Sequence, residues 1–92
     1  MRLRYDTRAL RDLEAIRAYI ARDDLAAAGR VISRIEKSIA RLVFAPFSAR
    51  AGVAAGTRLL VVPRTPYLVV YKVRAETVDI IAVLHSARNQ RD

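Results

Sequence analysis

Residues 56–88 read GTRLLVVPRTPYLVVYKVRAETVDIIAVLHSAR, and this stretch decides the fold. Within it, three runs are rich in Val, Ile, Leu and Tyr, which pack well on the pleated surface of a β-sheet. The runs lie at 57–62, 67–73 and 77–84. The links that contain residues 64–66 and 74–76 are short enough for hairpins. The three runs are therefore predicted to form a small antiparallel sheet.

Apolar residues occupy both faces of this predicted sheet. Successive side chains of a strand point to opposite faces, yet adjacent apolar pairs occur at 59–60, 69–70 and 80–81. Strands with one wet face alternate instead between polar and apolar residues. Helices can cover one face. The other is predicted to be covered by the C-terminal tail, a second copy of the chain or a different protein.

The residues before this stretch predict a strand followed by two helices. Residues 2–5 alternate polar and apolar side chains, as a short strand does. Asp6 or Thr7 can cap a first helix. Apolar residues at helical spacing predict a second helix over about 25–44, which Pro46 ends. The fold class is therefore α+β, in the order β-α-α-β-β-β, with the helical hairpin packed on one face of the sheet.

Length and composition limit the class of protein. A chain of 92 residues, 53% of them hydrophobic, is predicted to form one domain over residues 1–92. Residues 48–56 are small and include two glycines, so they are predicted to form a loosely packed connection. No repeat or second domain is predicted.

The charge balance predicts an acidic partner, because the net charge is +8. The chain has no Cys and one His, so we expect no disulfide, no dedicated metal site and no cofactor. No apolar run approaches the length of a membrane span, and the N-terminus lacks the apolar core of a signal peptide. A cytoplasmic protein with no membrane partner is therefore expected.

Charged and titratable side chains accompany the predicted strands. His85 follows the last strand, and the reference pKa of histidine, about 6.5, suits a general base. A cationic surface for phosphate or carboxylate groups is predicted from Arg58, Arg64, Lys72 and Arg88. Tyr71 shares a strand face with Tyr67 and is a further candidate acid. The alternatives are a structural histidine, solvated charges that protect strand edges, and tyrosines of the core.

The chain resembles ParE-type toxins of the RelE/ParE superfamily of bacterial toxin–antitoxin systems over nearly its whole length. In the N-terminal part the resemblance lies in Ala9, Asp12, Leu13, Ile16, Tyr19, Ile20, Ala21, Asp24, Ala27, Ala28, Ile35, Leu42 and Pro46. In the C-terminal part it lies in Gly52, Gly56, Thr57, Arg58, Pro66, Tyr67, Tyr71, His85, Ala87 and Arg88. The order and spacing of these residues, more than any one of them, carry the resemblance.

The resemblance implies a toxin that poisons DNA gyrase without cleaving a substrate itself. It also implies a cognate antitoxin, ParD-like or related, that neutralises the toxin in a tight hetero-oligomer. The residues expected to contact the target or the antitoxin are Arg58, Arg64, Lys72, His85 and Arg88.

A RelE-like endoribonuclease that cuts mRNA on the ribosome is the alternative within the superfamily. Cleavage through the 2′-hydroxyl needs a base, an acid and cations. The candidates for these tasks are His85, Arg58, Arg88 and Tyr71. Residues 89–92 contain neither Tyr nor His, which favours binding over catalysis. A third interpretation is an inactive relative that binds only the antitoxin.

Overall fold

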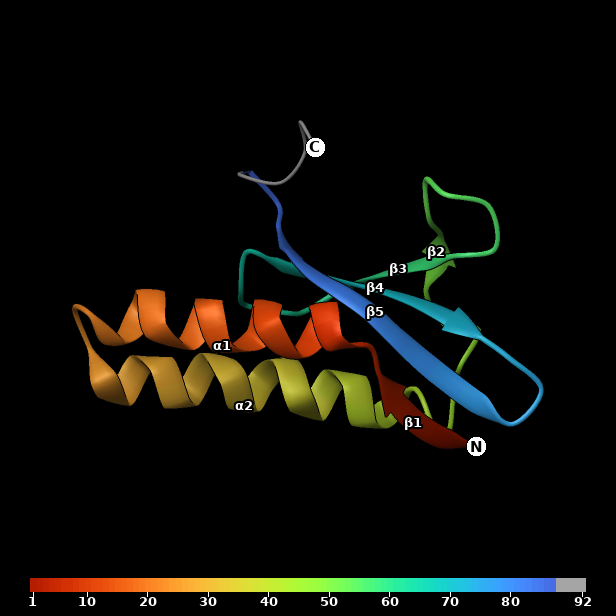
Figure 1. The fold of residues 1–92 in the computed structure, drawn as a ribbon, viewed down its shortest axis with the longest axis horizontal. Helices are drawn as coiled ribbons and strands as arrows, with labels where there is room; N and C mark the ends of the chain where they lie inside the picture. Colours follow the sequence, from red (N-terminus) through yellow and green to blue (C-terminus); the bar gives the residue numbers. More distant parts are fainter. Residues whose placement is uncertain (88–92) are drawn as a thin grey trace.

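The computed structural model describes residues 1–87 and shows in them two helices and five strands (Figure 1). The elements are β1 (Arg2–Tyr5), α1 (Thr7–Ala21), α2 (Leu25–Arg41), β2 (Arg50–Ala51), β3 (Arg58–Val61), β4 (Tyr67–Val73) and β5 (Thr77–His85). The predicted α+β fold class is confirmed, with the helical hairpin and the three C-terminal strands in their predicted places.

The five strands form one sheet in the order β1-β5-β4-β3-β2. The hairpins β3–β4 and β4–β5 are antiparallel, as predicted. Strand β1 instead runs parallel to β5, with Leu3 opposite Val78, so the sheet is mixed rather than purely antiparallel. The direction of β1 follows from the chain connection. Parallel neighbouring strands need a long crossover between them, and the chain between β1 and β5 includes both helices.

The connection of residues 48–56 is loosely packed, as predicted, since most of its side chains are exposed, but it also contains the short strand β2, which was not predicted. The strand pairs with the start of β3, and the Gly52 N–H donates to the Thr57 carbonyl at 2.8 Å. Gly56 has a φ of 79°, which a residue without a Cβ adopts at little cost. The small residues therefore make a tight reversal that extends the sheet.

Helix α2 starts at a side-chain cap and ends earlier than predicted. The Asp24 carboxylate accepts a hydrogen bond from the Ala27 N–H at 3.0 Å, which satisfies one of the free donors of the first turn. The helix ends at Arg41. Beyond it the Phe44 side chain is exposed, so no packing extends the helix, and Pro46 disfavours helical geometry in the residue before it.

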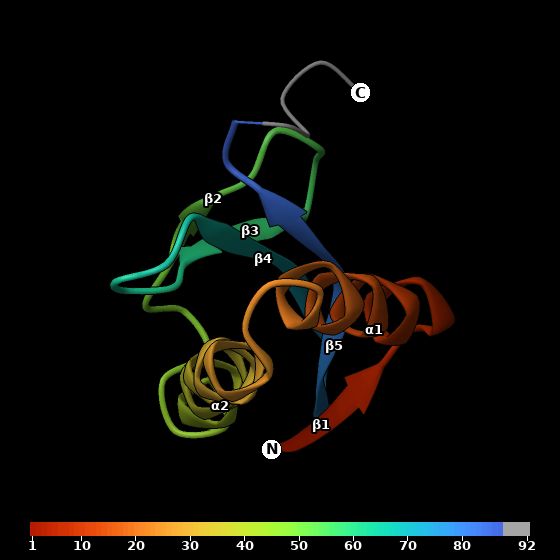
Figure 2. The same ribbon diagram turned by 90° about the vertical axis from the view of Figure 1, so that its left-hand side faces the viewer.

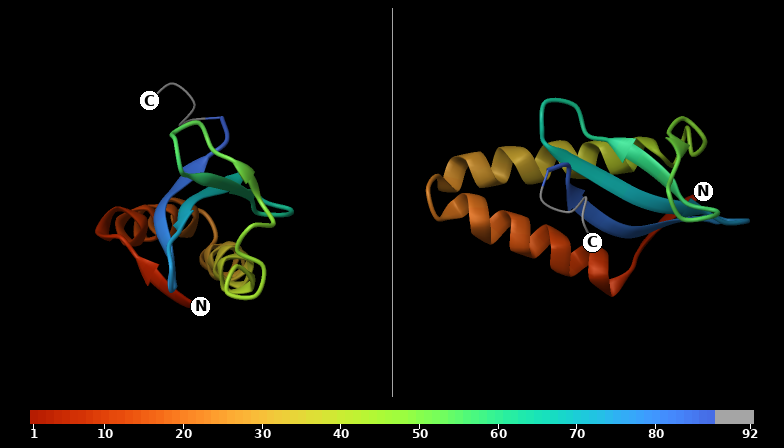
Figure 3. Two further views of the ribbon diagram at one scale, coloured as in Figure 1. Left: turned by 90° about the vertical axis from the view of Figure 1, so that its right-hand side faces the viewer. Right: turned by 90° about the horizontal axis from the view of Figure 1, so that it is seen from above.

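Both helices lie against the same face of the sheet (Figure 2, Figure 3). The helical layer contributes Ala9, Leu13, Ile16, Ile32, Ile35, Ile39 and Leu42 to the core. The sheet layer contributes Val62, Tyr67, Val69, Tyr71, Val78, Ile80 and Val83. Along β4 every second residue is buried, which matches the period of a strand. The core thus fills the space between the two layers.

The opposite face of the sheet carries half-buried apolar side chains. Strand pairing places Leu68 opposite Leu84, and Leu59 opposite Val70, on this face. The prediction of apolar residues on both faces is confirmed. Within residues 1–87, neither helix has the length and apolar character needed to cross a bilayer.

Candidate functional site

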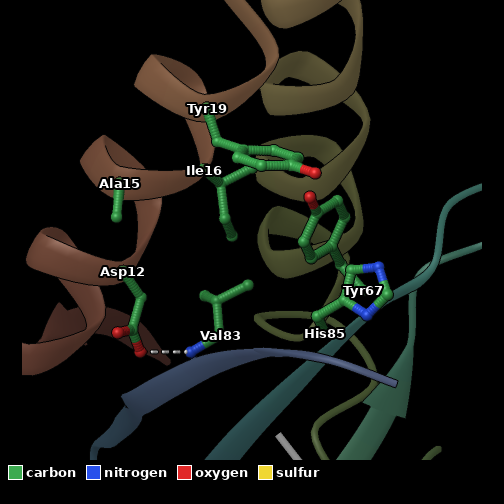
Figure 4. Close-up of a pocket in the computed structure, with 7 residues that line it drawn as sticks. All are labelled: Asp12, Ala15, Ile16, Tyr19, Tyr67, Val83 and His85. Atoms are coloured by element: carbon green, nitrogen blue, oxygen red, sulfur yellow. Dashed lines mark hydrogen bonds between the residues drawn. The ribbon is translucent and has the colours of Figure 1, made fainter. Parts of the chain in front are cut away.

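A hollow of about 350 Å³ opens between α1 and the C-terminal end of β5, beside the histidine of the chain (Figure 4). We call it the His85 hollow. It is lined by Asp12, Ala15, Ile16, Tyr19, Tyr67, Val83 and His85. Helical spacing puts Asp12, Ile16 and Tyr19 on one face of α1. Strand pairing places Tyr67 directly opposite His85. Three elements therefore build the hollow from residues far apart in the sequence.

Asp12 fixes helix α1 to the edge of the sheet. Its Oδ2 accepts a hydrogen bond from the Val83 backbone N–H at 2.9 Å and lies 3.6 Å from Arg8 Nε. Strand β1 pairs with β5 only as far as Ile80, so beyond that residue the carboxylate satisfies a donor that a neighbouring strand would otherwise satisfy. The Asp12 carboxylate therefore has a structural role in the absence of any ligand.

His85 is oriented by two contacts. Its ring meets the Tyr67 ring edge-on, with centroids 5.4 Å apart and planes at 88°. Its Nδ1 accepts a hydrogen bond from the Ala87 N–H at 3.1 Å. The neutral ring then carries its proton on Nε2, which can donate to a partner. Figure 4 shows the hydroxyl ends of Tyr19 and Tyr67 turned toward each other, with the His85 ring at the other end of the Tyr67 side chain.

Arg58 and Tyr71 anchor the loop that follows α2. The Arg58 guanidinium donates to the Ala49 carbonyl at 2.7 Å and lies 4.8 Å from the centroid of the Phe47 ring. The Tyr71 hydroxyl donates to the Pro46 carbonyl at 2.8 Å. Burial raises the pKa of Tyr71, which keeps this donor protonated. Both side chains make contacts within the fold that hold the loop in place.

Replacing Arg58 by Lys tests this anchoring. Lysine keeps the charge but lacks the planar group that reaches the carbonyl and stacks on the ring. We expect the free energy of unfolding to fall by about 1 kcal/mol in urea denaturation. Arg64→Lys, in the turn between β3 and β4, is the matched control and should change it by less than about 0.5 kcal/mol. Equal effects at both positions would show that the Arg58 contacts do not hold the loop.

The structure separates the cations that were predicted to form one surface. Arg58 is paired with Tyr71 and shares its side of the sheet, whereas Lys72 points to the opposite side. A common surface of Arg58 and Lys72 is therefore wrong. Arg64 lies in the β3–β4 turn with a φ of 62°, and Arg88 falls outside the described residues. The binding roles of the individual residues stay predictions.

A second hollow, of about 600 Å³, surrounds a buried carboxylate at the other end of the sheet. We call it the Asp79 hollow. Arg74 Nε donates to Asp79 Oδ2 at 2.6 Å, and the Thr77 hydroxyl donates to Oδ1 at 2.9 Å. These groups, Arg74 first, hold the pKa of Asp79 below its usual value. This cluster was not predicted from the sequence, although a carboxylate within the apolar run of β5 indicates such a group.

A third hollow, of about 520 Å³, lies on the sheet face opposite the helices. We call it the apolar hollow. Its lining residues are Arg50, Gly52, Val53, Ala54, Thr57, Leu59, Leu68, Val70, Leu84 and His85. The β2–β3 connection therefore overhangs the apolar side chains of β3, β4 and β5. His85 is the residue that borders both this hollow and the His85 hollow.

A sequence profile of the family described as "ParE toxin of type II toxin-antitoxin system, parDE" matches residues 3–90. The chain belongs to this ParE toxin family. The protein Y4kP of Sinorhizobium fredii is 41% identical over 92% of this chain and 88% of its own length. Toxin RelE2 of Caulobacter vibrioides is 38% identical over 88% of this chain and 90% of its own.

Solved structures share the fold of this ParE-family toxin. A chain of the chromosomal ParDE system from P. aeruginosa superposes with a TM-score of 0.82 at 23% identity, over 92% of this chain and 95% of that one. A chain of the intact E. coli RelBE toxin–antitoxin complex has a TM-score of 0.69 at 19% identity, over 95% and 98% of the two chains. ParE-type and RelE-type proteins therefore share the helical hairpin and sheet that position the three hollows.

Proposed function

We propose that this ParE-family toxin inhibits DNA gyrase by binding to it in the cytoplasm, and that a cognate antitoxin neutralises it by direct contact. One observation carries the choice of binding over catalysis. Arg58, which is the cation predicted for chemistry within residues 1–87, does not line the His85 hollow. The family description, which names the parDE system, is consistent with this choice.

Cleavage of RNA places several demands on one small space. A base must remove the 2′-hydroxyl proton, an acid must protonate the leaving oxygen, and a cation must stabilise the charge on phosphorus. The Asp12 carboxylate in the His85 hollow accepts a hydrogen bond from a backbone N–H, and Arg58, outside the hollow, donates one to the loop after α2. Lys72 lies on the other face of the sheet. This dispersal supports a surface that binds a protein target.

The apolar hollow supports an antitoxin as partner. It exposes parts of Leu59, Leu68, Val70 and Leu84 on one face, which neither helix covers. Each Å² of apolar surface removed from water contributes about 25 cal/mol, so an amphipathic segment laid here gains substantial free energy. Two of the solved relatives are described as toxin–antitoxin assemblies. We infer a hetero-oligomer in which the antitoxin covers this face.

A ribosome-dependent endoribonuclease is the second candidate, and the His85 hollow favours it. His85, Tyr67 and Tyr19 bring an imidazole and two hydroxyls to one place. The relative named toxin RelE2 is consistent with this candidate. His85 would then act as the base, and Arg88 would be its nearest predicted cation in the sequence.

Two parallel assays separate these functions. In the first, purified toxin is incubated with gyrase and supercoiled DNA, and cleaved DNA complexes are counted. In the second, it is incubated with translating ribosomes and a defined mRNA, and cuts are mapped by codon. We expect gyrase-dependent DNA breaks and intact mRNA. Codon-positioned cuts with unaffected gyrase would overturn the proposal in favour of the endoribonuclease, and no effect in either assay would favour the inactive relative.

His85→Ala sharpens the comparison. If His85 serves binding alone, we expect gyrase inhibition to change by less than about tenfold, because one rim contact is lost. If it is the base of a nuclease, mRNA cleavage should fall by about 100-fold or more. His85→Gln is the matched control, since it keeps a polar side chain and removes the imidazole. Loss of toxicity in both variants, with antitoxin binding intact, would contradict the assignment of His85 to binding alone.

A further inference from the structure

The face of the sheet opposite the helices changes character along β4. Leu68 and Val70 line the apolar hollow, and Lys72, next on the same face, lines the Asp79 hollow. A strand rises about 3.3 Å per residue, so the path from Leu68 to Arg74 covers about 20 Å. The two hollows are therefore consecutive parts of one surface, which is mainly apolar at one end, with Arg50 in its lining, and mainly charged at the other.

The charged end is positive even though it contains carboxylates. The Asp79 hollow is lined by Arg4, Asp6, Lys72, Arg74, Thr77, Asp79 and Ile81. Three of these residues are cations and two are carboxylates. The carboxylates also hold the arginines in place. Arg4 Nη1 lies 2.6 Å from Asp6 Oδ1 and 3.6 Å from Asp79 Oδ2, and Arg74 Nε lies 2.6 Å from Asp79 Oδ2. A guanidinium has five N–H donors, so each arginine keeps donors for a partner.

Lys72 stands at the junction of the two hollows. A Cβ placed on Gly56 would lie 3.5 Å from Lys72 Cε, so the lysine side chain passes close to this glycine. The β2–β3 connection therefore crosses the lysine stem, and the side chain is half-buried. Among residues 1–87, Lys72 takes part in none of the ion pairs, whereas Arg4 and Arg74 both do. Within residues 1–87, Lys72 is thus the cation of the Asp79 hollow whose charge is left for a partner, as is that of Arg50 in the apolar hollow.

We propose that these two hollows form one docking surface for a single antitoxin segment, with apolar side chains over Leu68 and Val70 and carboxylates over Lys72, Arg4 and Arg74. The proposal rests on the proposed antitoxin partner and adds the direction and chemistry of its segment. Charge complementarity selects this occupant: three cations line one end of the surface, Arg50 lines the other, and the chain as a whole carries +8. A second copy of the chain, being equally basic, would meet it with like charge.

The charged end sets the orientation of the segment more than its affinity. A segment laid in reverse would put carboxylates on Leu68 and Val70 and would desolvate Lys72 without a partner. Such an unpaired buried charge is penalised strongly, whereas the correct pairing gains modestly after desolvation. Lys72 is therefore a specificity-determining residue that rejects antitoxins lacking carboxylates at that end.

The experiment measures binding of the purified antitoxin encoded beside the toxin gene, by calorimetry at low and at physiological ionic strength. For Lys72→Glu we expect a Kd about 10- to 100-fold higher than wild type and a weaker dependence on salt. Lys72→Gln should give a smaller increase. Lys37→Glu, on the exposed face of α2, is the matched control and should stay within about twofold. Thermal unfolding of each variant reports its folding separately.

Val70→Asp separates this inference from the function on which it rests. If both Val70→Asp and Lys72→Glu weaken binding and Lys37→Glu does not, the bipolar surface is supported. If Val70→Asp weakens binding while the Lys72 variants bind like wild type, the antitoxin docks on this face but the charged end is wrong. If neither changes binding, docking on this face is wrong. A Glu→Lys change in the antitoxin that restores affinity for Lys72→Glu would identify the paired carboxylate.

Discussion

Replacing Ile35 by Ala is expected to lower the free energy of unfolding by about 2–5 kcal/mol. Ile35 is fully buried at the centre of α2 and belongs to the core between helices and sheet. The change removes buried methyl groups and leaves a cavity that the close-packed core around it cannot fully fill. A chain of this length has a stability of only about 5–14 kcal/mol, so the variant should approach the threshold of folding.

Urea denaturation at neutral pH, with the midpoint and the slope fitted separately, measures this loss. Leu25→Ala at the start of the same helix is the matched control, because its side chain is 78% exposed. We expect a change of less than about 0.5 kcal/mol there. A small effect at Ile35 with an unchanged slope would contradict the packing of α2 on the sheet.

Much of the core was predictable because it depends on local periodicity. Ile35 recurs at helical spacing with its neighbours on α2, and β4 was bounded correctly by its β-branched and aromatic composition. Two features were not predictable in this way. The parallel pairing of β1 depends on where the chain returns after two helices, and β2 depends on the tight reversal at Gly56. Neither leaves a periodic signal.

The candidate sites show the same division between local and distant determinants. The position of His85 at the end of a strand was predicted, but its neighbour Asp12 was not, because 71 residues separate Asp12 from its partner Val83. The failed pairing of Arg58 with Lys72 has a related cause. Adjacent strands share a face only in a given register, and the register follows from turn geometry that composition does not reveal.

The remaining large effect concerns Asp79. Replacing it by Asn should lower the free energy of unfolding by about 1–3 kcal/mol at neutral pH. The change removes a buried carboxylate that accepts hydrogen bonds from Arg74 and Thr77. Arg74 is 61% exposed, so solvent screening places the effect toward the lower end of that range. Chemical denaturation measures it. Asp23→Asn, in the exposed turn between the helices, is the matched control and should have little effect.

The pH dependence gives this prediction a sharper form. The hydrogen bond from Arg74 and the other local contacts hold the pKa of Asp79 in the folded protein below that of the unfolded chain, which is about 3.9. A lowered folded pKa contributes stability that is complete above about pH 4 and is lost as the pH falls through the folded pKa. Wild type should therefore lose its advantage over Asp79→Asn in acid. Stability curves that stay parallel from neutral pH into that range would mean that the Arg74 contact with Asp79 does not stabilise the fold.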